Sequence, residues 1–170
     1  LIFNIQPLDD IILTKKDKVS LKHKVYFVGQ AISPSTLASS SRSFDIIAVN
    51  FTPLGIFQLT GVNLNNFTNQ IVDAEMVFGK EINELYEKII ESQSIEQAIY
   101  LIDTFLCMRA KNSKKYNKPP VVLALSILKQ GAGGVNVKML EKTTNTTSKT
   151  LERLFKSEIG MTPKMYQRLL

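Results

Sequence analysis

The side chains with the most distinctive chemistry in this 170-residue chain recur along one short stretch near its end. Lys149, Glu152, Arg153 and Lys156 are spaced at i, i+3, i+4 and i+7, so a helix would place them on one face. A guanidinium binds guanine bidentately, a carboxylate accepts from the amino group of cytosine, and an ammonium binds phosphate. This face therefore has the chemistry that contact with a nucleic acid requires.

We assign different partners to the members of this face. Lys149, Glu152 and Arg153 are the candidates for base edges, with Arg153 pairing with guanine and Glu152 with cytosine. Ser148 and Lys156 are placed for phosphates, which position a protein without specifying a sequence. An intradomain salt bridge is the alternative interpretation for Arg153.

Apolar side chains between these polar positions predict the helix that carries them. They recur at helical spacing and would form one inward stripe, at Leu151, Leu154, Phe155 and Ile159. Thr147 is suited to cap the start of this helix, and we also include it among the candidate DNA contacts. Gly160 is suited to end it, and Met161 would add the apolar contact that accompanies such an end.

A shorter helix and a turn are predicted just before this one. Val137 and Leu140 are three residues apart and would share one side of the shorter helix. A run of threonines then interrupts the pattern, and Asn145 within it suits a left-handed turn. Further on, Thr162 and Pro163 predict the cap and first position of a third helix.

These residues resemble a known family. The string TSKTLERLFK at 147–156, followed by GMTP at 160–163 and Tyr166, is similar to the first helix-turn-helix of AraC/XylS-type bacterial transcription regulators. The family pattern is Leu-x-Arg-x-Phe, a spacer, Gly-x-Ser/Thr-Pro and a Tyr. The match covers residues 135–170, and FTPLG at 51–55 more weakly resembles the sensor region of one subgroup. The resemblance implies binding to double-stranded DNA, a cytoplasmic location and no cofactor.

The chain departs from the family pattern at four positions. Glu141 stands where the family usually has a small residue, Asn145 replaces a turn glycine, and Thr144 and Thr146 replace aliphatic residues. We expect these changes to loosen the helix packing, and Glu141 to reach solvent or a partner, because burying an unpaired charge is costly. Such regulators carry two of these units, so we also expect a linking helix to continue beyond Leu170.

A second hypothesis follows from these departures. The unit has decayed, on this hypothesis, into a dimerisation module or a module that binds a protein or small molecule without binding DNA. Salt would discriminate between the two, because DNA binding through several Lys and Arg contacts weakens steeply as ionic strength rises. A homodimer and a small-molecule effector are the other partners that we consider.

The charge of the chain is divided unevenly along its length. Residues 111–170 hold 12 Lys and Arg against 3 Glu, whereas residues 1–110 hold 9 against 12 acidic residues. The asymmetry favours a nucleic-acid-facing tail on a near-neutral body, with solvated surface charge as the alternative. The single cysteine, Cys107, excludes an internal disulfide framework and reads as a small buried hydrophobe.

Other chemistry is weakly indicated. His23 is the only histidine and has no neighbouring cluster of metal ligands. The glycines at 131–134 lack the lysine of a phosphate-binding loop, so we predict a helix end there. No paired carboxylates or catalytic triad can be defended, so we predict neither an enzyme nor a metal site. No apolar run is long enough to span a bilayer.

The remainder of the chain predicts an α+β fold. Residues 1–52 are rich in short β-type runs that suggest a small barrel or curved sheet. Helical patterns begin at Ile71 and include a hairpin of two helices, which either mediates dimerisation or covers the sheet. We therefore predict a β-rich sensor domain at 1–110, a linker at 111–118, and the first half of an all-α, helix-turn-helix DNA-binding domain at 119–170. An effector pocket in the β region would be lined by Phe3, Tyr26, Val28 and Ile46, which serve equally well as core.

Overall fold

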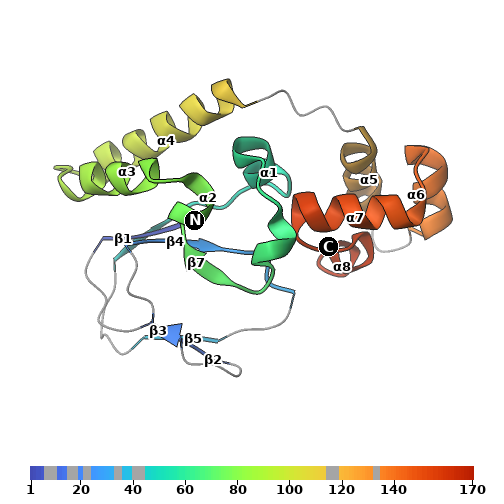
Figure 1. Ribbon diagram of the computed structural model, residues 1–170, viewed down its shortest axis with the longest axis horizontal. Helices are drawn as coiled ribbons and strands as arrows, with labels where there is room; N and C mark the ends of the chain where they lie inside the picture. Colours follow the sequence, from blue (N-terminus) through green and yellow to red (C-terminus); the bar gives the residue numbers. More distant parts are fainter. Residues whose placement is uncertain are drawn as a thin grey trace.

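The computed structural model describes residues 1–5, 11–14, 19–20, 24–32, 36–39, 45–113, 119–131 and 135–170. It shows the predicted α+β class, with antiparallel strands in the first half and helices in the remainder (Figure 1). Residues 1–113 are called the sheet region below, and residues 119–170 the helical region. His23 and residues 114–118 of the predicted linker lie outside the described residues, and α4 continues to Asn112.

The main sheet is antiparallel throughout and has the strand order β6-β1-β4-β7. Its strands are β1 (Ile2–Asn4), β4 (Val25–Val28), β6 (Ile46–Ala48) and β7 (Ile71–Asp73). A second sheet has the order β3-β2-β5, formed by β2 (Ile11–Thr14), β3 (Val19–Ser20) and β5 (Thr36–Ser39). The sequence wrongly predicts helix from Ile71, because a three-residue edge strand such as β7 is too short to show an alternating pattern.

Helices cover one face of the main sheet (Figure 1). They are α1 (Gly55–Thr60), the 3-10 helix η1 (Leu64–Phe67), α2 (Glu75–Phe78), α3 (Glu81–Ile90) and α4 (Ile95–Asn112). Phe3, Val25 and Phe27 lie on this face and pack with buried side chains of the helices. The helices contribute Ile56, Val77, Phe78, Ile82, Leu85, Ile89, Ala98 and Ile102.

The predicted helical hairpin is formed by α3 and α4. Ser94 caps α4 by accepting a hydrogen bond from the backbone N–H of Gln97, and the Gln97 side chain accepts one from the N–H of Gln93. Ile82 and Ala98 belong to the core beneath the sheet face, so the hairpin does cover the sheet. The role of the hairpin in dimerisation stays a prediction.

The strand register shows that the predicted effector pocket is not formed. Phe3 lies opposite Val25, whereas Tyr26 lies opposite Ile2, so Phe3 and Tyr26 are on opposite faces of the sheet. Both are buried, but Val28 and Ile46 are exposed. These four side chains therefore do not line a common interior. Cys107 is likewise exposed rather than buried, because α4 has apolar residues on more sides than the sheet covers.

The helical region has a core of its own. It consists of α5 (Pro119–Gln130), α6 (Val137–Thr144), α7 (Ser148–Ile159) and α8 (Pro163–Gln167). The core is formed by Val121, Ala124, Leu125, Leu128, Leu140, Leu151, Phe155, Ile159, Met161 and Tyr166, with Leu54 from the sheet region. Val137 is exposed, contrary to the shared side predicted with Leu140, and α5 leaves Val122 and Leu123 exposed.

Candidate nucleic-acid interface

Backbone caps fix the angle between α6 and α7. Asn145 adopts the left-handed conformation, with φ 47° and ψ 42°, and ends α6 where the sequence predicts a turn. Thr147 then caps α7, its hydroxyl accepting from the N–H of Thr150 at 3.4 Å. At the other end, Gly160 has a φ of 87°, and its N–H donates to the carbonyl oxygens of Phe155 and Lys156.

Glu141 supplies a second cap for α7 from the neighbouring helix. Its carboxylate accepts a hydrogen bond from the backbone N–H of Ser148, with 2.6 Å between oxygen and nitrogen. A negative charge there is favoured because the first N–H groups of a helix carry partial positive charge. The Thr144 hydroxyl donates to the carbonyl of Leu140 at 2.7 Å, and the Thr146 hydroxyl to that of Thr144. The polar residues at the turn therefore have partners.

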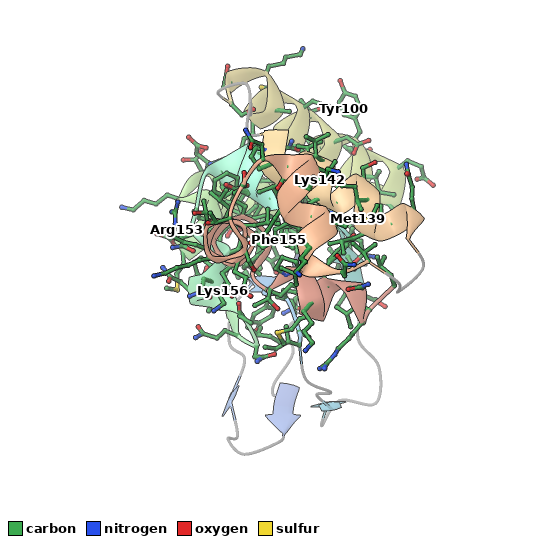
Figure 2. The ribbon with its side chains drawn as sticks, turned by 90° about the vertical axis from the view of Figure 1, so that its right-hand side faces the viewer. Tyr100, Met139, Lys142, Arg153, Phe155 and Lys156 are labelled. Atoms are coloured by element: carbon green, nitrogen blue, oxygen red, sulfur yellow. The ribbon has the colours of Figure 1, made fainter. Side chains whose placement is uncertain are left out.

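The two sides of α7 differ in burial. Leu151, Phe155 and Ile159 are buried against the other helices, and Leu154 is partly buried. Glu158 is also fully buried, which the sequence does not predict. The exposed side carries Lys149, Glu152, Arg153 and Lys156. In Figure 2, Phe155 lies on the α6 side of α7, and Arg153 and Lys156 lie on the side away from α6.

This exposed side forms one wall of a groove. Lys149, Glu152, Arg153, Lys156 and Ser157 line it from α7, and Asn63 and Asn65 line it from the segment that contains η1. The groove has a volume of about 490 Å³ and is open to solvent. Side chains nearly a hundred positions apart in the sequence are thus brought together at the boundary between the two regions.

The end of α7 is tied directly to η1. The Thr68 hydroxyl donates a hydrogen bond of 2.6 Å to the carbonyl oxygen of Gly160. A Cβ at position 160 would lie only 3.3 Å from Cβ of Gln30 and 3.4 Å from the carbonyl oxygen of Leu64. Glycine is therefore required at 160 for its positive φ, and its small size also suits this close approach.

The cations of this groove have no partner within the described part of the chain. In the part of the chain that the structure describes, the ion pairs are Lys24–Glu87 and Arg109–Glu81, and both lie in the sheet region. Lys149, Arg153 and Lys156 have neither a hydrogen-bond nor an ion-pair partner among those residues. The intradomain salt bridge that was the alternative for Arg153 is therefore not formed among them.

No family model, curated protein or solved structure matches this chain.

Four of the six predicted contact residues line the groove together, namely Lys149, Glu152, Arg153 and Lys156. Thr147 and Ser148 lie beside it at the start of α7. The Thr147 hydroxyl caps the helix, and the backbone N–H of Ser148 donates to Glu141. Asn63 and Asn65 were not predicted, because no local pattern links η1 to α7. The sequence does give one indication that this segment differs from the rest: between Asp45 and Asp73 it contains no charged residue and is rich in asparagine.

A second hollow, of about 370 Å³, lies between the main sheet, residues 48–53 and the end of α7. Val28 is the one residue of the proposed effector pocket that lines it, together with Gly29, Leu64 and Ile159 among others. Within the described residues, no cluster of His, Cys, Asp and Glu is arranged to hold a metal ion. The described helices also include none that is both long and apolar enough to cross a membrane.

Proposed function

We propose that this protein is a sequence-specific, DNA-binding regulator of transcription of the AraC/XylS type. The observation that carries the proposal is the exposed face of α7, where Lys149, Arg153 and Lys156 lie in one groove without partners among the described residues. In helix-turn-helix proteins the second helix enters the major groove and presents such a face to the base edges. Support also comes from the capped turn between α6 and α7, which holds this face outward.

On this proposal the residues of α7 have distinct roles. Arg153 donates two hydrogen bonds to guanine, Glu152 accepts one from cytosine, and Lys149 reaches an adjacent base edge. Lys156 and Ser148 contact phosphates. A cytoplasmic location, a homodimer and a small-molecule effector remain further parts of the proposal.

The alternative of a decayed unit has less support. It arose from Glu141 and the threonines of the turn, which were expected to loosen the packing. Glu141 instead caps α7, and the hydroxyls of Thr144 and Thr146 are hydrogen-bonded to backbone carbonyls. The polar residues at the turn thus have a structural explanation that needs no loss of DNA binding.

The test is the sequence preference of variants at Arg153. A preferred duplex is first selected from a random pool with the wild type, and each single-base change is then measured in competition. Arg153→Ala is expected to relax the preference at one base pair by about 1–3 kcal/mol. Arg153→Lys, the matched control for charge, should relax it similarly while keeping most of the affinity. Equal losses on every sequence would remove Arg153 from the base-reading residues.

A further inference from the structure

We propose that the groove between η1 and α7 binds the sugar-phosphate backbone of DNA, with Asn63 and Asn65 as phosphate contacts supplied by the sheet region. The inference rests on the proposed function and extends it, because it assigns part of the DNA interface to residues outside the helical region. Asn63 and Asn65 line the same groove as the candidate reading residues of α7.

The groove offers hydrogen-bond donors to a phosphate backbone. Phosphate and sugar oxygens are acceptors, and the ammonium of Lys156 and the side-chain amides of Asn63 and Asn65 are donors. Asn63 caps η1 through its side-chain oxygen, which accepts from the N–H of Asn65 at 3.1 Å. Its NH₂ group is thereby left to donate elsewhere. The other charged residues that line the groove, Lys149, Glu152 and Arg153, are assigned to base edges by the proposed function.

A helix in the major groove has a DNA backbone on each side of it. A helix with its side chains is about 10–12 Å wide and fills a major groove of about 12 Å, so the two phosphate backbones run along its flanks. An element that lies beside the exposed face of α7, as η1 does, is therefore positioned against one of these backbones. Thr68 holds η1 in this position by its hydrogen bond to Gly160.

The opposite possibility is that η1 covers α7 and blocks it. A cover for a basic helix would be stabilised by acidic side chains, as in the pairs Lys24–Glu87 and Arg109–Glu81. The sequence between Asp45 and Asp73 contains no charged residue, and the η1 side of the groove offers only neutral amides. Among the described residues that line the groove, Glu152 is the only acidic one against three cations, which favours an anionic occupant of the groove.

The experiment measures binding of the full chain to a fluorescently labelled DNA duplex of random sequence, between about 50 and 200 mM salt. Asn65→Ala is expected to weaken binding about threefold to tenfold, because one hydrogen bond to phosphate is lost. The salt slope should not change, because a neutral amide releases no counterion. Asn65→Lys should steepen the slope of log K against log salt by about 0.9. Asn66→Ala is the matched control, since Asn66 is exposed on η1 but does not line the groove.

Each contrary result has a distinct meaning. If η1 blocks the helix, Asn65→Ala tightens binding and Asn65→Lys leaves the salt slope unchanged, and either result overturns the inference. Lys156→Gln, compared with Lys88→Gln on α3, tests the proposed function separately by lowering the slope by about 0.9. A lower slope for Lys156→Gln, with Asn65 variants that match Asn66→Ala, leaves the proposed function and removes the phosphate contact. Absence of salt-dependent binding in the wild type removes both.

Discussion

In the sheet region two cations, Lys24 and Arg109, pair with carboxylates of α3, whereas in the helical region the cations of α7 face outward. Lys24 pairs with Glu87 and lies over the ring of Tyr86, and Arg109 contacts Glu81 at 2.6 Å. Lys149 and its neighbours on α7 have no such partners among the described residues.

The acidic residues of the two regions differ in the same way. Glu81 and Glu87 neutralise cations from other elements, whereas Glu141 caps a helix. Among the described residues, the three cations on the exposed side of α7 therefore remain available for an external partner. A charge count alone does not distinguish these situations, because the same number of cations can be paired or free.

The largest expected effect tests whether the two cores are separately stabilised. Phe155 is fully buried in the core of the helical region, so Phe155→Ala should destabilise it by about 3–5 kcal/mol through lost contacts and a cavity. Hydrogen exchange should accelerate in α5–α8 and change little in α3. Phe78→Ala, in the core of the sheet region, is the matched control and should give the reverse pattern. Equal acceleration in both regions for either variant would show that they unfold as one unit.

A smaller effect is expected from removing the carboxylate of Glu141, which caps α7. Glu141→Ala should cost about 1–2 kcal/mol, because the Ser148 N–H loses its charged acceptor at the start of α7. Urea denaturation followed by circular dichroism measures the change. Glu152→Ala removes an exposed carboxylate from the same helix pair and should be nearly neutral for stability. Similar losses from the two substitutions would contradict the assignment of Glu141 as a cap.

The smallest effect compares two buried tyrosines at alkaline pH. Burial raises the pKa of Tyr86 and of Tyr166; at Tyr86 the nearby Lys24 ammonium opposes this increase and the Glu87 carboxylate adds to it. A raised folded-state pKa contributes stability that is complete below the unfolded value, about 10, and is lost as pH rises through the folded value.

Both regions should therefore lose stability as pH rises beyond about 10. Tyr166→Phe and Tyr86→Phe should each protect the protein against alkaline destabilisation, because each removes a buried phenol whose ionisation opposes folding. The urea midpoint of each variant, measured on both sides of that pH, gives the comparison. A variant that loses stability at alkaline pH as steeply as the wild type would show that its tyrosine does not contribute to the loss.

Local signals in the sequence predict local structure well in this protein. The caps at Thr147 and Thr162, the left-handed turn at Asn145 and the glycine end at 160 all appear where the residue types require them. Each depends on hydrogen bonds within a few residues, which the sequence displays directly. The inner side of α7 is also predicted, apart from the buried Glu158, because its apolar residues recur at helical spacing.

Features that depend on distant partners are not predicted. The face on which Phe3 or Tyr26 lies depends on strand register, and the exposure of Cys107 depends on how much of α4 the sheet covers. The place of Asn63 and Asn65 beside α7 depends on how two separately packed cores meet. Glu141 shows a further limit, since its departure from the family pattern is visible in the sequence but its hydrogen bond to Ser148 is not.

A small change in backbone angle at Gly160 would be magnified along α7. The helix has 12 residues, and at a rise of about 1.5 Å per residue it is about 18 Å long. The C-terminal end of α7 is held by the hydrogen bond between Thr68 and Gly160, and its candidate reading residues lie nearer the N-terminal end. A rotation of about 10° at Gly160 would displace the Ser148 end by about 3 Å, nearly the rise of one base pair. The packing of α7 against the other helices opposes such a rotation, so the core of the helical region and the contact between Gly160 and Thr68 together set the direction of α7.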